Sequence, residues 1–434
     1  MPIHEQSTET TGLLENERDR YGAAEATQGE ESWQDLKNYI KPLVAANFMS
    51  ILVGLNDGNI GVIIPRLRIH YDVNIQTVSL LFLCNAIGFL ISAASNGYMV
   101  HRFGQLGAIY IGSVGVLLSY LLLMQAFPFT ITCALMVLQG SGVAFLDAGM
   151  NVYTANVPMA TMMLNILHAL YGVGAMISPL VNSFFLAHQL SWRYMYGFLG
   201  SVAFLNLVLI TVGFRNVNVD GEETTLSEGE TGTVGSSSKH VSKKDAILNR
   251  MTLLCAFYIL VYVGVEIIVG GWGFTFLTVG RHGNEVAMNR VMSGYWAGLA
   301  LGRVVLGYVA GRFGEKATVT VLTVLTAVLL ALVALVPNVA VDSAAIVLTG
   351  FVIGPMFPTT VSLVSKVLPR QWHATSIGFI AAVGASGAAV FPFVTGIIAG
   401  AVSVLAIPYI CLAMTIAMQI MWIGVPSKDR IENR

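Results

Sequence analysis

The sequence predicts an all-α membrane protein with about twelve transmembrane helices, arranged as two pseudo-symmetric six-helix bundles. Three observations predict this fold class. The chain of 434 residues is 55% hydrophobic and only 11% charged, whereas soluble domains carry about 25% charged residues. Apolar stretches of about 20 residues, the length that spans a bilayer as a helix, recur along the chain. One eight-residue motif also occurs twice, about half a chain apart.

The apolar stretches divide into two sets of six. The first set spans residues 40–65, 75–98, 105–126, 129–155, 162–187 and 192–214. The second set spans residues 250–279, 287–310, 316–336, 342–366, 372–400 and 402–424. Between them, residues 215–249 are rich in Gly, Ser, Thr and Glu, a composition too polar to form a packed core. We therefore expect a disordered tail (1–39), a bundle (40–214), a linker (215–249), a second bundle (250–424) and a short tail (425–434).

The distribution of Lys and Arg predicts the orientation, because cytoplasmic loops of membrane proteins carry an excess of both residues. With a cytoplasmic N-terminus, the cluster Lys239, Lys243, Lys244 and Arg250 also lies in the cytoplasm. The opposite side then receives few basic residues. We therefore expect both termini and the 215–249 linker on the cytoplasmic side.

The repeated motif reads Gly-Tyr-Met-Val-His-Arg-Phe-Gly at 97–104 and Gly-Tyr-Val-Ala-Gly-Arg-Phe-Gly at 307–314. The two copies are 210 residues apart, and each follows an apolar stretch. Such an internal repeat indicates that the two halves share one architecture. The two copies share glycine and arginine at corresponding positions. We expect gating or structural roles for these residues, which are Gly97, Arg102, Gly104, Gly307, Arg312 and Gly314.

Four ionisable residues stand within the apolar stretches, namely Asp57, Asp147, Glu266 and Arg303. Ionisable groups in mid-membrane cost several kcal/mol and are functional candidates by default. Asp57 lies between Gly54 and Gly61, and glycines allow close helix approach or local unwinding. A buried carboxyl group of this kind can exchange a proton near physiological pH. The alternative is a structural carboxylate bonded to Asn56 or to a neighbouring helix.

A second polar group is expected on the fourth and fifth helices. Asn151 follows Asp147 by four residues, so both lie on one helix face. Together they offer hydrogen-bond donors and acceptors to hydroxyl groups or water. Asn165, His168 and Tyr171 form a polar stripe on the next, otherwise apolar helix. We expect this stripe to line the pathway, although a single His in a helix is more often a packing residue.

Glu266 and Trp272 lie on the seventh expected helix, where Glu266 is the repeat counterpart of Asn56. Glu266 would either line a cavity or form a contact between the halves. Trp272 offers a stacking surface for a sugar ring or an apolar solute. Arg303 is about two turns from the cytoplasmic end of its helix, where its side chain can reach the interface. We expect a structural or gating role for it rather than substrate binding.

The twelve helices, the six-plus-six division and the paired Gly-x-x-x-x-Arg-x-Gly loops resemble the major facilitator superfamily. The motif of that family normally has an acidic residue before the Arg, where this chain has His101 and Gly311. This departure removes the carboxylate that would take part in a conformational lock. The resemblance covers residues 40–424 and implies a transporter with two bundles around a central cavity.

Shorter motifs resemble the fucose–proton symporter branch of that family, in a eukaryotic, fungal-like form. They are Leu-Asn-Asp ending at Asp57, Leu-Asp-Ala-x-x-Asn ending at Asn151 and Leu-Asn-x-x-His ending at His168. The resemblance implies roles in proton coupling and sugar binding for Asp57 and Asp147. The chain departs from the branch in having Asp at 147 instead of Glu, and His168 and Tyr171 instead of amides. These departures affect the identity of the solute more than the mode of transport.

From these patterns we expect a secondary active transporter of a small polar, sugar-like solute, coupled to protons and working by alternating access. Asp57 and Asp147 would couple protons. The expected substrate-binding residues are Asn56, Asn151, Asn165, His168, Tyr171, Glu266 and Trp272. The alternatives are a carrier of a non-sugar metabolite or drug, and a solute sensor on the same fold that does not transport.

Enzyme activity is not expected, because the chain has no nucleotide-binding loop, His-Glu-x-x-His motif or nucleophile elbow. We expect no cofactor and no metal site, since the four cysteines lack metal-type spacing. The near-neutral net charge of −1 argues against nucleic acid as a partner. The expected partners are the solute, protons and membrane lipid, with the chain acting as a monomer.

The N-terminal tail carries an acidic dileucine pattern formed by Glu9, Leu13 and Leu14. It is similar to signals that sorting adaptors read on the way to endosomal and vacuolar membranes. We therefore expect a vacuolar or endosomal membrane, with the plasma membrane as the alternative if the pattern arose by chance.

Overall fold

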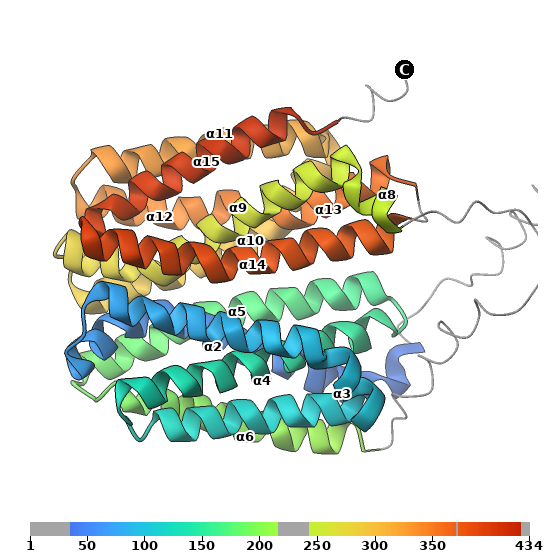
Figure 1. Cartoon of the computed structure of the whole chain (residues 1–434), viewed down its shortest axis with the longest axis horizontal. Helices are drawn as coiled ribbons and strands as arrows, with labels where there is room; N and C mark the ends of the chain where they lie inside the picture. The colour runs from blue at the N-terminus through green and yellow to red at the C-terminus, as the bar shows by residue number, and fades with distance from the viewer. Residues whose placement is uncertain (1–34, 216–242, 370–371, 427–434) are drawn as a thin grey trace, which may run out of the picture.

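The computed structural model describes residues 35–215, 243–369 and 372–426 (Figure 1). The first half contains η1 (Asp35–Asn38), α2 (Ile40–Tyr71), α3 (Ile75–Leu123), α4 (Phe129–Ala155), α5 (Ala160–Ala187) and α6 (Arg193–Gly213). The second half contains α8 (Lys243–Leu248), α9 (Arg250–Thr275), η3 (Phe276–Gly280), α10 (Glu285–Phe313), α11 (Glu315–Leu335), α12 (Val339–Ile353), α13 (Met356–Val367), α14 (His373–Ala401), η5 (Val404–Ala406) and α15 (Ile407–Ile423). The order of elements thus divides the described chain into two halves of similar architecture.

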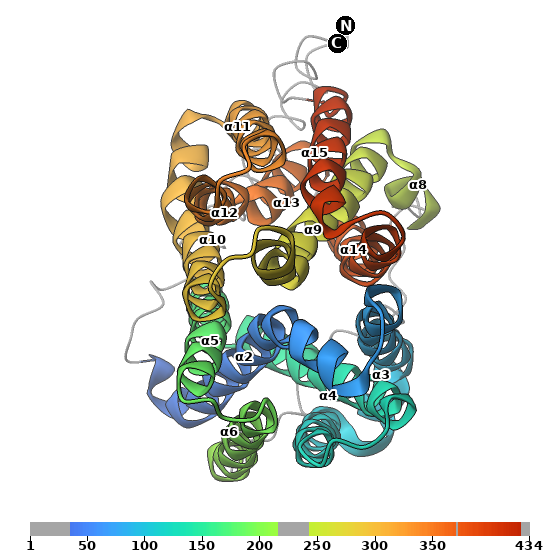
Figure 2. The ribbon, with the colours of Figure 1, turned by 90° about the vertical axis from the view of Figure 1, so that its left-hand side faces the viewer.

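The two halves lie side by side as separate bundles, which the end view in Figure 2 shows most directly. Helices α2, α3 and α5 of the first bundle face α9, α10 and α14 of the second. The end of the molecule that carries α8 is called the linker end below. The opposite end, where residues 72–74 connect α2 to α3, is called the far end.

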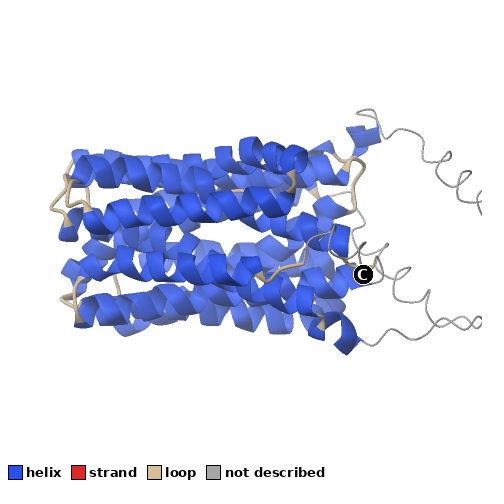
Figure 3. Cartoon of the chain, turned by 90° about the horizontal axis from the view of Figure 1, so that it is seen from above, coloured by secondary structure: helices blue, strands red, loops and turns tan. Residues whose placement is uncertain are grey.

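Ten helical segments of the described chain are long and apolar enough to cross a membrane, so the protein is an integral multi-pass membrane protein. No strand occurs over the described ranges (Figure 3). Helix α3 counts once among the ten although it has 49 residues. A straight helix of that length would extend about 74 Å, more than twice the ~30 Å of a bilayer core. With α3 crossing twice and α10 once, the arrangement is consistent with the expected twelve passes.

The final glycine of each repeated motif has a backbone conformation that other residues rarely adopt. Gly104 has φ 74° and ψ 166° and is the non-helical residue inside α3. Gly314 has φ 95° and ψ 131° and separates α10 from α11. A residue with a Cβ is strained at positive φ, whereas glycine is not. The repeated motif therefore ends in a glycine because the chain changes direction there in both halves.

The repeat also extends to the packing between helices. A Cβ at Gly88 on α3 would collide with the backbone carbonyl of Val137 on α4. A Cβ at Gly298 on α10 would be 2.8 Å from the backbone carbonyl of Val347 on α12. Both the glycines and their partners are 210 residues apart, the spacing of the repeated motif. The same close approach of two helices is thus built at the same place in each half.

Two expected helix boundaries are wrong. Helix α2 continues to Tyr71, six residues beyond the expected end at Pro65. A proline inside a transmembrane helix is tolerated where neighbouring groups satisfy the freed backbone carbonyl. The expected helix 342–366 is instead two helices that meet at Gly354 and Pro355. Pro355 has no backbone N–H with which to continue the hydrogen-bond ladder. Part of the expected linker also forms a helix, α8.

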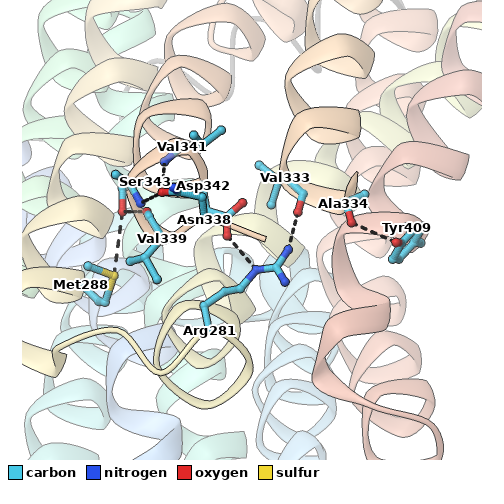
Figure 4. A network of polar contacts seen from close by, with 11 residues as sticks. Arg281, Met288, Val333, Ala334, Asn338, Val339, Val341, Asp342, Ser343 and Tyr409 are labelled. Carbon is cyan, nitrogen blue, oxygen red and sulfur yellow. Dashed lines mark hydrogen bonds and ion pairs between the residues drawn. The ribbon is translucent and has the colours of Figure 1, made fainter. Parts of the chain in front are cut away.

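A buried ion pair fastens the far end of the second bundle (Figure 4). The Nε of Arg281 lies 2.7 Å from the Oδ2 of Asp342, whose side chain is fully buried. A second guanidinium nitrogen of Arg281 donates to the carbonyl of Val333 at 2.9 Å. Nearby, the hydroxyl of Tyr409 donates to the carbonyl of Ala334 at 2.9 Å. These contacts tie the end of η3 to α11 and α12, and α15 to α11.

Polar contacts join the two halves in the part of the molecule nearer the far end. They are an ion pair between Arg66 and Glu285 (3.5 Å), a hydrogen bond from Ser183 to the carbonyl of Val286 (3.1 Å) and one from Ser293 to the carbonyl of Met176 (2.6 Å). Toward the linker end, Asn165 on α5 is exposed, and nothing lies within 4 Å of a Cβ placed on Gly378 of α14. The halves are therefore closed at the far end and parted toward the linker end.

Candidate functional site

A cavity of about 320 Å³ lies between the two halves. Its lining comes from α2, α3, α4 and α5 of the first half and from α9, α10 and α14 of the second. Phe82 and Trp272 lie between the cavity and the far end, with ring centroids 5.5 Å apart. The lining residues Asp57 and Trp296 lie near the middle of α2 and α10, so the cavity lies near the centre of the membrane-spanning region.

Asn56 organises the first half of the site. Its side chain is buried, and its Oδ1 accepts hydrogen bonds from the hydroxyl of Tyr120 at 2.8 Å and from the amide of Gln139. Its Nδ2 donates to the Oδ1 of Asp57 at 3.1 Å. Asn56 thus connects α3 and α4 to the carboxylate on α2.

Asp57 lines the cavity and has a second donor. The hydroxyl of Tyr171 on α5 donates to the Oδ2 of Asp57 at 2.8 Å. Tyr171 reaches this carboxylate because α2 and α5 approach closely, and a Cβ on Gly54 would collide with the backbone carbonyl of Tyr171. The arrangement includes the bonds to Asn56 and to a neighbouring helix that a structural carboxylate would have. It also leaves Asp57 half-buried at the cavity wall.

Asp147 lines the same cavity from α4. The Nδ2 of Asn151 donates to the Oδ1 of Asp147 at 3.2 Å and to the backbone carbonyl of Asp147 at 2.9 Å. The side chain of Asn151 thus turns back along its own helix, outside the cavity lining formed by the described residues. The cavity therefore holds two carboxylates from two different helices, Asp57 and Asp147.

The polar stripe on α5 runs from the cavity toward the linker end. Tyr171 and His168 line the cavity. Asn165 is one turn closer to the linker end and is exposed. From the cavity toward the linker end the order is Tyr171, His168 and Asn165. Only Asn165 lies outside the cavity lining.

Glu266 and Arg303 form an ion pair in the second half of the site. The Nη2 of Arg303 lies 3.2 Å from the Oε1 of Glu266. The hydroxyl of Tyr262 donates to the other carboxylate oxygen, and Tyr295 donates to the backbone carbonyl of Glu266 at 2.8 Å. Arg303 lines the cavity, whereas Glu266 lies behind it, outside the lining formed by the described residues. Arg303 thus belongs to the cavity wall, and Glu266 holds it there.

The two tryptophans of this region have different surroundings. Trp272 is fully buried and its Nε1 donates to the carbonyl of Pro392 at 2.9 Å, away from the cavity. Trp296 on α10 is also buried but belongs to the cavity lining. Its ring packs where a Cβ on Gly270 of α9 would otherwise lie. The aromatic surface that the sequence assigned to Trp272 is therefore offered to the cavity by Trp296.

Several residues of the cavity lining were not predicted from the sequence. Among them are Asn85 and Phe89 on α3 and Ala385 on α14. An amide inside an apolar stretch was a usable signal for Asn85, because polar groups are rare there. The Nδ2 of Asn85 is buried and has no hydrogen-bond partner among the described residues. Apolar lining residues carry no such signal, because apolar side chains face both the lipid and the cavity.

The residues of the repeated motif lie away from the cavity, around the turns at the linker end. Gly97 and Gly307 have open space around the position of a Cβ. The guanidinium of Arg102 lies 5.7 Å from the ring centroid of Phe103. Arg312 is exposed. The expected sorting residues Glu9, Leu13 and Leu14 lie outside the described residues. Within the described ranges no cluster of three His, Cys, Asp or Glu side chains could hold a metal ion.

Two similar helical bundles around a central cavity that contains carboxylates define a membrane protein of the transporter class. The family model of the Major Facilitator Superfamily matches residues 46–284 and 254–434, and the chain belongs to this superfamily. Its members are transporters rather than enzymes.

Relatives in sequence cover most of the chain. The protein called Bypass of stop codon protein 6 of Saccharomyces cerevisiae is 27% identical over 416 residues, covering 88% of this chain and 82% of the relative. A glucose/galactose transporter of Brucella abortus is 24% identical over 404 residues, covering 87% of this chain and 93% of the relative.

Solved structures show the same fold at lower sequence identity. The crystal structure of a D-xylose–proton symporter aligns with a TM-score of 0.71 at 15% identity, covering 90% of this chain and 98% of the other. The nucleoside transporter NupG aligns with a TM-score of 0.70 at 11% identity, covering 90% of this chain and 99% of the other.

Proposed function

We propose that this transporter carries a small polar, sugar-like solute together with protons, by alternating access. The observation that supports this most strongly is the placement of Asp57 and Asp147 in one cavity between the two halves. Carboxylates are costly inside a membrane protein and are kept where they have a function. The sugar-like solute is supported by the glucose/galactose transporter among the relatives and by the shared fold of the D-xylose–proton symporter.

The geometry supports a protonation-dependent role for Asp57. In its ionised form, the carboxylate accepts hydrogen bonds from Tyr171 and Asn56. In its protonated form, one oxygen becomes a donor and can bind a hydroxyl oxygen of the solute. Solute affinity then depends on proton occupancy, and a difference in affinity between states is what coupling requires. Asp147 offers a second carboxyl group to the same solute.

The substrate-binding set that we propose follows the cavity. His168, Tyr171 and Arg303 contact the solute, together with Asp57 and Asp147. Asn56 lines the cavity and positions Asp57. Glu266 positions Arg303 from behind the lining, and Asn151 holds Asp147. Asn165 lies on the path toward the linker end, and Trp272 closes the far side against Phe82. The motif residues Gly97, Arg102, Gly307 and Arg312 act at the linker-end turns.

The resemblance to the fucose–proton symporter branch, a monomeric state and a vacuolar or endosomal location remain parts of this proposal. We place the linker end in the cytoplasm, in accordance with the Lys and Arg distribution. The structure then corresponds to the cytoplasm-facing state. A sorting adaptor that reads Glu9, Leu13 and Leu14 would account for the internal location.

The experiment that tests proton coupling compares Asp57→Asn and Asp147→Asn in reconstituted vesicles. An imposed pH gradient should drive accumulation of D-glucose, D-galactose or D-xylose by the unmodified protein. Each Asn variant should lose this accumulation, because the amide has nearly the shape of the protonated acid but cannot release a proton. Exchange of solute without a gradient should survive in one of the two variants and thereby identify the coupling residue.

Asp72→Asn is the matched control, since Asp72 is an exposed acid at the far end of α2 with φ 49°, a conformation that Asn also tolerates. It should accumulate solute as well as the unmodified protein does. Accumulation by both cavity variants would show that neither acid couples protons. Solute binding without any uptake by the unmodified protein would instead favour a sensor on the same fold.

The similarity of the fold to that of a nucleoside transporter supports a second candidate function, a carrier of a non-sugar metabolite. Uridine in the same uptake assay separates the two, because a nucleoside carrier would accumulate it in preference to the three sugars.

A further inference from the structure

In the ion pair between Glu266 and Arg303, only one partner faces the cavity. The side chain of Arg303 is 24% exposed and lines the cavity, whereas that of Glu266 is 8% exposed and lies behind it. Glu266 is fixed from two sides, by the hydroxyl of Tyr262 on its carboxylate and by Tyr295 on its backbone carbonyl. The cavity therefore meets a guanidinium whose charge is already balanced.

The guanidinium retains hydrogen-bonding capacity although its charge is balanced. An Arg side chain has five N–H donors. One of its Nη atoms faces Glu266, and its Nε is buried with no hydrogen-bond partner among the described residues. The 24% of the side chain that is exposed lies at the cavity wall. Arg303 can thus donate to an oxygen of a solute without adding net charge to the cavity.

The other charged or titratable groups of the cavity are on the opposite wall. They are Asp57 on α2, Asp147 on α4, and His168 and Tyr171 on α5. The described parts of α3, α9 and α14 contribute apolar, glycine and amide residues to the lining, and none that is ionisable. When both acids carry their protons and His168 is neutral, the formal charge of the cavity is zero, because Arg303 and Glu266 cancel.

We propose that the Glu266–Arg303 pair sets the charge selectivity of the carrier, so that the proton-loaded cavity accepts an uncharged solute and rejects its anionic and cationic analogues. This inference rests on the proposed function and adds the charge class of the solute. A charged solute would enter a low-dielectric cavity that has no net charge to compensate it, which is unfavourable. An uncharged solute with several hydroxyl groups needs no balancing charge in the cavity. Its oxygens can also accept hydrogen bonds from Arg303.

The test uses three probes of similar size, D-glucose, D-glucuronate and D-glucosamine. The purified full chain is held in detergent at a mildly acidic pH, where the amine of glucosamine is protonated. The rise of the thermal unfolding midpoint with probe concentration gives the affinity for each probe. The unmodified protein should bind D-glucose more tightly than either charged analogue, and the reverse order would overturn the inference whether or not any variant folds.

Three variants test whether removing either charge of the pair shifts the preference toward a probe of the predicted charge. Glu266→Gln leaves Arg303 unbalanced and should shift the ratio of glucuronate to glucose affinity by about tenfold or more toward glucuronate, because the carboxylate of glucuronate then balances the guanidinium in place of Glu266. Arg303→Gln leaves Glu266 unbalanced and should shift preference toward glucosamine. The double variant Glu266→Gln/Arg303→Gln removes both charges and should again prefer the uncharged sugar, even if its overall affinity is lower.

Asp342→Asn provides the matched control. It removes the acid of another buried ion pair of the second bundle, between Arg281 and Asp342 (Figure 4). That pair lies at the far end, and neither residue lines the cavity. It should lower thermal stability but leave the order of the three probes unchanged. A change of that order in the control would show that loss of any buried acid alters selectivity, which contradicts the inference.

The outcomes separate this inference from the proposed function. If D-glucose binds but Glu266→Gln and Arg303→Gln do not shift preference in opposite directions, the charge-selectivity role is wrong and the sugar carrier stands. If none of the three probes stabilises the unmodified protein, the sugar-like function fails, and the inference falls with it.

Discussion

At the scale of single residues, the site depends on how each carboxylate is held. Asp57 has a donor on each oxygen, Asn56 on one and Tyr171 on the other. Glu266 is held by Tyr262 and faces Arg303. Asn56 and Glu266 occupy equivalent positions of the repeat, 210 residues apart. The same position thus organises an acid of the cavity wall in one half and a balanced ion pair in the other.

Tyr171→Phe tests the role of the hydroxyl group on Asp57. The substitution removes one donor to the carboxylate and keeps the ring that packs against α2. Hydrogen bonds to charged groups contribute about 1.5–3 kcal/mol, so pH-gradient-driven uptake should fall by about tenfold or more. Initial rates of sugar uptake into reconstituted vesicles measure the effect.

Tyr258→Phe is the control for that substitution. The hydroxyl of Tyr258 is buried and lies 3.2 Å from the hydroxyl of Thr323, outside the cavity. Its removal should lower thermal stability without a comparable loss of uptake. Equal losses in the two variants would mean that the Tyr171 hydroxyl contributes only to packing.

At the scale of helices, the repeated motif is explained by backbone conformation. Gly104 and Gly314 both have positive φ, and each marks a change of direction between consecutive helices. The glycine that begins each copy, Gly97 or Gly307, lies inside a helix with open space around it. One motif therefore contains two glycines with different requirements, and only the last is needed for the fold.

Gly104→Ala and Gly97→Ala make this difference measurable. Alanine at 104 would be forced into a conformation that costs about 1–3 kcal/mol, and the thermal unfolding midpoint should fall. Alanine at 97 should leave the midpoint unchanged or raise it, because alanine is favoured over glycine in a helix by up to about 1 kcal/mol. Equal behaviour of the two variants would show that the positive φ of Gly104 is not a constraint.

The helices and the repeat were predictable because their signals are local. Apolar stretches of membrane-spanning length identify α4, α5 and α6 almost to the residue. The break between α12 and α13 has no signal in the apolar pattern, because Pro355 lies inside one continuous apolar stretch. The extension of α2 to Tyr71 lies outside the apolar stretch, because its last turns contain Arg66, Arg68 and His70.

The candidate site was predictable only in part. Ionisable residues inside apolar stretches pointed to Asp57 and Asp147, and both line the cavity. Which of two tryptophans on neighbouring helices faces the cavity depends on how those helices cross, and the sequence contains no local signal for that. The same holds for Glu266 and Arg303, which are 37 residues apart in the chain and meet only in the folded bundle.

At the scale of the whole molecule, the two bundles are closed at the far end and parted toward the linker end. The joining contacts include the ion pair of Arg66 with Glu285, both partly exposed, and exposed ion pairs contribute only about 0–1 kcal/mol. This ion pair therefore contributes little to the closure, and the proposed alternating access requires that solute and protons shift the balance between two states. A carrier needs such a balance, whereas a fixed receptor does not.

The proposed function requires solute and protons to cross the membrane together through this cavity. The direct measurement follows the pH inside sealed vesicles that contain the purified protein and a trapped pH-sensitive dye, with no pH gradient at the start. Adding D-glucose, D-galactose or D-xylose outside should acidify the interior with the unmodified protein and not with the Asp57→Asn/Asp147→Asn double variant. Entry of the sugar without any change of internal pH would contradict the account.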